Sequence, residues 1–195
     1  MRIDQDVKLD YKDVLIRPKR STLGSRKEVS LERSFKFCNY DPPFPENIKD
    51  YHYNGIPIMA SNMDGVGTFK MADKLAEGGI FTCLVKTYSA EDLINYFDVR
   101  FPERTANVAM SIGTSELDFD KLSNVISVVE EHLKYVCIDI ANGYSNHFAQ
   151  HVRKVREAFP HLIIIAGNVV TGEMTEELIL AGADIVKVGI GPGSV

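Results

Sequence analysis

Hydrogen-bonding or charged side chains, or bare backbone, follow each of six apolar runs in this sequence. These residues are Ser61, Asn62, Asp64, Lys86, Ser111, Thr114, Asp139, Asn142, Asn168 and the segment 189–195. Each of them alone could be a turn or helix-capping residue. Because the ends of parallel strands meet at one edge of a sheet, the set as a whole predicts a polar basin.

Asp139 ends one of the runs and precedes Ala141, Asn142 and Gly143. A carboxylate at this position can accept hydrogen bonds from two ribose hydroxyls, the usual way of holding the sugar of a nicotinamide nucleotide. The same side chain could instead begin an Asx turn before the next helix. The residue types leave both interpretations open.

Two lysines stand out, one at a strand end and one within an apolar run. Lys86 could contact a phosphate or polarise a leaving group, although a lysine at a strand end commonly just reaches solvent. Lys187 lies within an apolar run, where an unpaired charge is costly. We therefore predict that Lys187 forms a structural ion pair in the interior of the fold.

The segment Gly189-Ile190-Gly191-Pro192-Gly193-Ser194 exposes its backbone, since three glycines permit close approach and Pro192 stiffens the turn. Outward carbonyls could hold a monovalent cation, and inward amides with the Ser194 hydroxyl could hold a phosphate. A plain strand-to-helix turn is the alternative. The density of glycine favours a binding loop.

The cysteines and histidines do not predict a metal site. Cys83 and Cys137 lie in apolar runs, where thiols are usually inert packing groups, and Cys38 lies in the N-terminal region. An odd number of widely spaced cysteines fits reduced thiols of the cytoplasm. His147 and His151 are an i, i+4 pair without the glutamate of HExxH, so we interpret them as a helix surface.

Amphipathic segments separate the apolar runs. The runs are Ile56–Ala60, Ile80–Val85, Ala106–Met110, Tyr135–Ile138, Leu162–Ala166 and Ile185–Val188, and their continuity is typical of parallel strands buried on both faces. A helical face spans 119–133, and another spans 148–159 between a Ser145 cap and Pro160. Thr68 and Thr171 are predicted to cap two more helices.

Six strands alternating with five helices leave two α/β architectures, an open doubly wound sheet or a (β/α)8 TIM barrel. The glycines at 189, 191 and 193 do not match GxGxxG. A complete barrel needs about 250 residues, so this chain would supply roughly its first six strands. Residues 1–54 are expected to form an N-terminal extension with a capping hairpin made of Val29–Leu31 and Phe35–Phe37, and residues 55–195 the first part of one incomplete domain.

Composition excludes some partners. The net charge of -5 gives no reason to expect nucleic acid or an anionic membrane as a partner, and no apolar run approaches the ~18 residues of a membrane span. The N-terminus lacks a signal-peptide hydrophobic segment. We expect a cytoplasmic protein that binds neither nucleic acid nor membrane.

Five motifs resemble the IMP dehydrogenase and GMP reductase family: Tyr11–Pro18, Ala60–Asp64, Asp139–Ser145, Ala166–Glu173 and Lys187–Val195. The last three are similar to the GMP reductase branch in particular. Only residues 100–104 fill the place where the dehydrogenases usually insert two regulatory modules, and Pro192 stands where they usually have serine. Gly65 and Thr87 depart from the family pattern.

The resemblance implies a (β/α)8 barrel in purine nucleotide salvage that converts GMP and NADPH into IMP, ammonia and NADP⁺ through a covalent cysteine thioimidate. It implies a homotetramer in which Ser25 and Arg26 reach the cofactor of a neighbouring subunit. It also assigns the remaining roles to residues of this sequence. The NADPH site would comprise Lys86, Asp139, Ile140, Ala141, Ile190 and Gly191, the nucleotide site Asn62, Asp64 and Ser194, and the potassium site the carbonyls of Gly191 and Gly193.

The resemblance places the nucleophilic cysteine directly after Val195, so no catalytic nucleophile is expected within these residues. We therefore expect that the 195 residues alone do not catalyse the reaction. An IMP dehydrogenase-like enzyme is one alternative. A non-catalytic protein that binds nucleotides or contacts other subunits is another.

Overall fold

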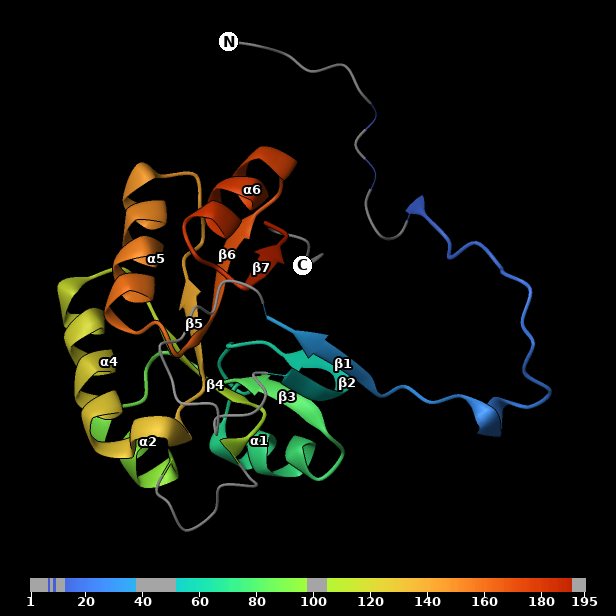
Figure 1. Cartoon of the computed structure of the whole chain (residues 1–195), viewed down its shortest axis with the longest axis horizontal. Helices are drawn as coiled ribbons and strands as arrows, with labels where there is room; N and C mark the ends of the chain where they lie inside the picture. The colour runs from blue at the N-terminus through green and yellow to red at the C-terminus, as the bar shows by residue number, and fades with distance from the viewer. Residues whose placement is uncertain (1–6, 8, 10–12, 38–51, 98–104, 191–195) are drawn as a thin grey trace. The chain divides into compact units, whose positions relative to one another are not determined.

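The computed structural model describes residues 7, 9, 13–37, 52–97 and 105–190 (Figure 1). The chain forms two compact units. One comprises residues 1–30 with 191–195, and the other comprises residues 31–190 and contains the sheet. In the first unit the described residues are exposed and include one short 3-10 helix, η2 (Arg26–Glu28).

The sheet of the larger unit has seven strands whose spatial order follows the sequence. They are β1 (Arg33–Lys36), β2 (His52–Ala60), β3 (Ile80–Cys83), β4 (Val108–Ile112), β5 (Tyr135–Asp139), β6 (Ile163–Val169) and β7 (Ile185–Val188). Strands β2 to β7 are all parallel. A doubly wound sheet would reverse its strand order at a switch point. The unbroken order therefore confirms the first six strands of a (β/α)8 barrel.

The helices are α1 (Phe69–Ala76), α2 (Ala90–Phe97), α4 (Glu116–Val129), α5 (Asn146–Ala158) and α6 (Gly172–Leu180), with a short 3-10 helix η3 (Glu130–His132) after α4. As predicted, the hydroxyls of Thr68, Ser145 and Thr171 accept hydrogen bonds from the first-turn amides of α1, α5 and α6. Helix α4 ends before Leu133, the last residue of its predicted face.

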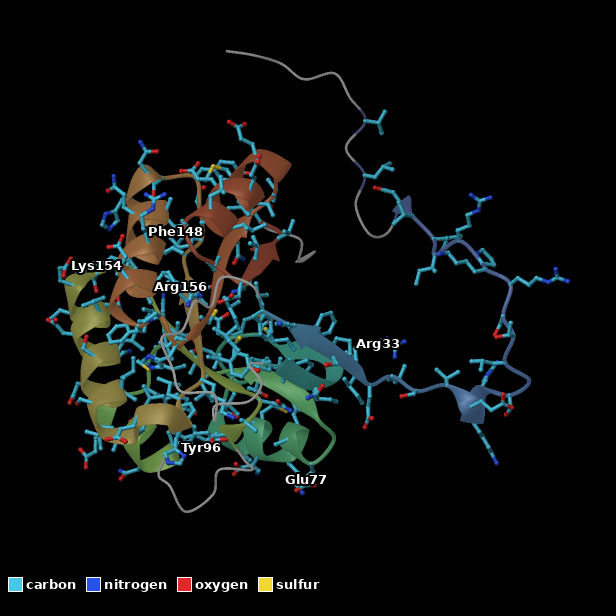
Figure 2. All side chains as sticks on the ribbon, viewed as in Figure 1. Arg33, Glu77, Tyr96, Phe148, Lys154 and Arg156 are labelled. Carbon is cyan, nitrogen blue, oxygen red and sulfur yellow. The ribbon has the colours of Figure 1, made fainter. Side chains whose placement is uncertain are left out.

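Apolar side chains gather on both faces of the parallel strands, as their continuous runs predict. The face toward the helices carries alternate residues such as Met110, Val136 and Ile164. They belong to one buried cluster with helical residues such as Phe148 of α5, which Figure 2 labels. The opposite face, the barrel interior, carries Tyr53, Phe81, Cys83, Ala109, Tyr135, Cys137, Ile163 and Ile165. The helices therefore cover one face, and the other face is free to build the inside of the barrel.

One of the two strands of the predicted N-terminal hairpin is wrong. Strand β1 pairs antiparallel with the start of β2, from Arg33 opposite Gly55 to Lys36 opposite His52, and not with residues 29–31. Aromatic packing explains the choice, because the Phe35 ring lies 6.3 Å from that of Tyr53. Val29 and Leu31 stay about half exposed. The boundary expected at 54/55 therefore falls inside β2.

The interpretation of His147 and His151 as a helix surface is half wrong. His147 is exposed, but His151 is buried, with its ring 6.3 Å from Phe119 of α4. It occupies the buried face of α5 because it follows Phe148 by three residues and precedes Val155 by four. Over the ranges that the structure covers, no helix has the length and apolar character needed to cross a membrane.

Candidate functional site

Three polar side chains meet inside the barrel at the carboxyl ends of its strands. The Lys187 ammonium donates a hydrogen bond to Asn62 Oδ1 over 2.9 Å and forms an ion pair with the Asp139 carboxylate. Lys187 is on β7, Asp139 ends β5, and Asn62 lies in the loop after β2. The predicted interior ion pair of Lys187 is confirmed, and its partner is Asp139.

The charge of Lys187 is stabilised by its surroundings. Burial lowers its pKa, but the neighbouring Cys137 thiol and the Asp139 carboxylate outweigh this effect and raise the pKa overall. The two side chains of the pair keep 23% and 22% of their surface exposed. The pair is thus fixed in position and still open to a ligand.

Gly167 on β6 makes room for this cluster. A Cβ atom there would stand 2.5 Å from the Lys187 Cβ and 2.6 Å from the Lys187 carbonyl oxygen. Sequence reasoning quoted Gly167 only as part of a motif and missed this role. The available signal was a glycine in an otherwise apolar strand, which commonly marks a close approach of another backbone.

The loop after β5 is held tightly to the end of β6. The Ile140 amide donates to the Gly167 carbonyl over 2.9 Å, and the Gly143 amide donates to the Asn168 carbonyl over 2.8 Å. The Asx turn of this loop is made by Asn142, whose Oδ1 accepts a hydrogen bond from the Tyr144 amide. Asp139 is instead bound by Lys187, so its interpretation as the start of an Asx turn is wrong.

Other predicted residues lie at the rim of the larger unit. Lys86 is exposed after β3, and its carbonyl accepts a hydrogen bond from Lys121 Nζ over 2.8 Å. Asp64 and Ala141 are also exposed. Ile190 follows Gly189, whose amide donates to the Val169 carbonyl over 2.7 Å at a φ of 143°, where glycine is favoured.

The remaining predicted binding residues lie in the smaller unit or outside the described residues. Ser25 caps η2 by accepting a hydrogen bond from the Lys27 amide, and Arg26 begins that helix in the smaller unit. Gly191, Gly193 and Ser194 lie outside the described residues. Across the described segments, no group of three or more histidine, cysteine or acidic side chains could hold a metal ion.

The whole chain resembles one family. Residues 8–195 match the family model described as "IMP dehydrogenase / GMP reductase domain". The chain belongs to the IMP dehydrogenase / GMP reductase family. This family membership confirms the resemblance that the five motifs indicate.

Curated relatives in this family carry a common name. A "GMP reductase" from Buchnera aphidicola subsp. Schizaphis graminum is 54% identical over all 195 residues, which cover 53% of that protein. "GMP reductase 1" of Homo sapiens is 52% identical over 194 residues, again 100% of this chain and 53% of the relative. The chain thus spans about half the length of the curated relatives it matches.

A solved structure supports the fold of the family. The "Inosine 5' monophosphate dehydrogenase from Legionella pneumophila" superposes with a TM-score of 0.75 over 96% of this chain and 52% of the other. The two sequences are 24% identical. The likeness therefore bears on the barrel architecture alone.

Proposed function

We propose that this chain belongs to a GMP reductase, an NADPH-dependent oxidoreductase of purine nucleotide salvage. The reaction converts GMP, NADPH and one proton into IMP, ammonia and NADP⁺ through a cysteine thioimidate. The observation that carries this proposal is the identity of 52–54% to proteins named GMP reductase along the whole chain. Because the chain spans about half of their length, the reaction is proposed for the whole protein and not for the 195 residues alone.

The end of β5 fits a nicotinamide nucleotide. The Asp139 carboxylate is partly exposed and is oriented by Lys187, so ribose hydroxyls can reach an acceptor that does not rotate freely. Ile140, Ala141, Ile190 and Gly191 would line the same site, and the exposed Lys86 would meet a phosphate. When bound, NADPH would supply a hydride to the purine ring.

The nucleotide substrate is proposed to lie against Asn62 and Asp64, with Ser194 at its phosphate. The Asn62 amide is held through its oxygen by Lys187, which leaves its NH₂ group as a donor for the ligand. The carbonyls of Gly191 and Gly193 are proposed to bind a potassium ion. The resemblance of motif 187–195 to the family supports these proposed glycine and serine roles.

We further propose a cytoplasmic homotetramer in which Ser25 and Arg26 reach a neighbouring subunit. The side chains of Leu15 and Ile16 are 97% exposed, which supports packing of this segment against another protein surface. Residues 55–195 are proposed as the first part of one barrel domain and residues 1–54 as its extension, although the boundary cuts β2 after its third residue. The antiparallel direction of β1 supports only the assignment of β1 to the extension.

The test is an assay of the full-length protein with two substrate pairs. GMP with NADPH should yield IMP, ammonia and loss of NADPH absorbance, and replacing potassium by lithium should slow this reaction. Turnover of IMP with NAD⁺ and not of GMP with NADPH would identify a dehydrogenase and contradict the proposal. Absence of both activities in a folded protein would contradict it as well.

A further inference from the structure

Three sulfur atoms cluster inside the barrel below the Lys187–Asp139 pair. Cys83 Sγ on β3 lies 3.3 Å from Met59 Sδ on β2, and Cys137 on β5 belongs to the same buried cluster on the interior face. The side chains of both cysteines are free thiols and at most 1% exposed. Neither thiol has a role in the function proposed above.

Barrel geometry explains why these side chains converge. In a (β/α)8 barrel, inward residues of alternate strands share one layer. Strands β3, β5 and β7 are alternate strands, and each contributes an inward residue to this level, namely Cys83, Cys137 and Lys187. The sulfur cluster is therefore a product of strand register and not of a flexible loop.

The charges around the cluster favour an anionic sulfur. The hydrogen bond from Cys83 lowers the pKa of the Cys137 thiol against the effect of burial, and the Lys187 ammonium acts in the same direction. The same hydrogen bond and burial raise the pKa of Cys83. Cys137 is thus the first thiol to deprotonate, beside a fixed positive charge.

We propose that Cys83, Cys137 and Met59 form a binding site for a soft monovalent metal ion, copper(I) in biology and silver(I) as a probe. Thiolate and thioether ligands select copper(I) over harder ions. One Cu⁺ would replace one proton on each thiol, giving Cu(SR)₂⁻ and two H⁺ with no change in oxidation state. The Lys187 ammonium lies where it offsets the negative charge of that complex.

The donor set of the cluster is soft. Met59 is partly buried and lines a cavity of about 350 Å³ on the interior face, together with Tyr53 and Phe81. A hard divalent ion finds no carboxylate in the cluster itself, since its three donors are all sulfur.

The experiment is native mass spectrometry of the full-length protein with one equivalent of silver(I), in a background where Cys38 and every cysteine after Val195 are replaced by serine. We expect one bound silver per chain and a mass that shows the loss of two thiol protons. In competition titrations, Cys83→Ala or Cys137→Ala should weaken binding by at least about a hundredfold, more than loss of an outer partner costs. Met59→Leu should weaken it about tenfold, as a thioether is the weaker ligand.

Met110→Leu is the matched control, since Met110 is fully buried on the opposite face of β4 and should not affect silver binding. If an alanine variant fails to fold, the corresponding Cys→Ser variant replaces it in the comparison. Met59→Leu keeps both thiols and therefore tests the site without changing either cysteine. X-ray absorption of the copper(I)-loaded protein should show sulfur ligands only. Equal silver binding by the Cys83→Ala/Cys137→Ala double variant, or a nitrogen or oxygen shell around copper, would overturn the proposal.

Discussion

Two ion pairs lie at opposite ends of the same parallel strands and differ in how completely they are enclosed. At the amino ends, Arg156 of α5, which Figure 2 labels, binds Asp184 over 2.5 Å. The aspartate side chain is fully buried. At the carboxyl ends, Lys187 binds Asp139, and about a fifth of each side chain is exposed. Both pairs join a basic side chain to an aspartate within one barrel.

The hydrogen bonds of the two pairs differ even more. Arg156 also donates to the carbonyls of Gly182, Pro160 and Leu162, and Asp184 accepts the Ile164 amide. Lys187 has Asn62 as its further partner. The first pair is held by several further hydrogen bonds within the protein, whereas the second keeps polar capacity for a ligand. This contrast agrees with the rule that barrels place stability at the amino ends and chemistry at the carboxyl ends of their strands.

The largest effect is expected at the enclosed pair. Asp184→Asn should lower the free energy of unfolding by about 3–5 kcal/mol, because it leaves the Arg156 charge buried without its partner. Urea titration measures this loss. Activity per folded molecule should stay at the wild-type level, and a stable but inactive variant would contradict the assignment of this pair to stability.

The open pair should respond in the opposite way. Under the proposed function, Lys187→Met should reduce kcat/KM about a hundredfold, which corresponds to ~2.7 kcal/mol of transition-state stabilisation. The free energy of unfolding should change little, because water can hydrate the partly exposed Asp139 carboxylate. Lys187→Arg should recover part of the activity. A Lys187→Met variant that loses stability but keeps wild-type activity would reverse the comparison.

Gly167 tests whether the position of Lys187 matters, and not only its charge. Gly167→Ala should cost about 1–3 kcal/mol of stability through overpacking against the Lys187 Cβ, and kcat/KM should fall with it. Gly172→Ala is the control, because a Cβ at Gly172 meets no atom within 4 Å. Equal behaviour of the two variants in denaturation and kinetics would remove the packing argument.

A smaller effect comes from His151, which belongs to neither ion pair. Burial lowers its pKa, and the neighbouring Lys154 and His147 charges add to this effect. The unfolded chain then binds the proton more tightly, so stability should fall as the pH drops below the ordinary histidine pKa of about 6.5. His151→Phe should make the free energy of unfolding less dependent on pH between pH 7 and pH 5. An unchanged slope would exclude His151 as the source of that pH dependence.

Local signals predicted much of the fold. Hydroxyl residues before apolar periodic segments identified three helix starts, and continuous apolar runs identified the six parallel strands. The pairing of β1 with β2 escaped prediction because it depends on contact between Phe35 and Tyr53 across the chain. The burial of His151 was not predicted, because histidine is a polar residue type that is usually assigned to the exposed face of a helix.

The sequence singled out the residues of the site but did not predict which of them contact one another. Asp139 and Asn62 each follow an apolar run, which placed them at one edge of the sheet, whereas Lys187 was predicted to form an interior ion pair without a named partner. Lys187 is separated from Asp139 by 48 residues and from Asn62 by 125, so only the arrangement of the strands in the sheet brings them together. The burial of Cys83 and Cys137, which their apolar runs predicted, is confirmed. Their inertness stays a prediction.

The most direct test of this account is a paired measurement of kcat/KM for GMP with NADPH and of urea stability in Lys187→Met and Asp184→Asn of the full-length protein. The account predicts a stable but nearly inactive Lys187→Met and a destabilised but active Asp184→Asn. Full activity in Lys187→Met would contradict the central claim that the open end of the strands carries the chemistry.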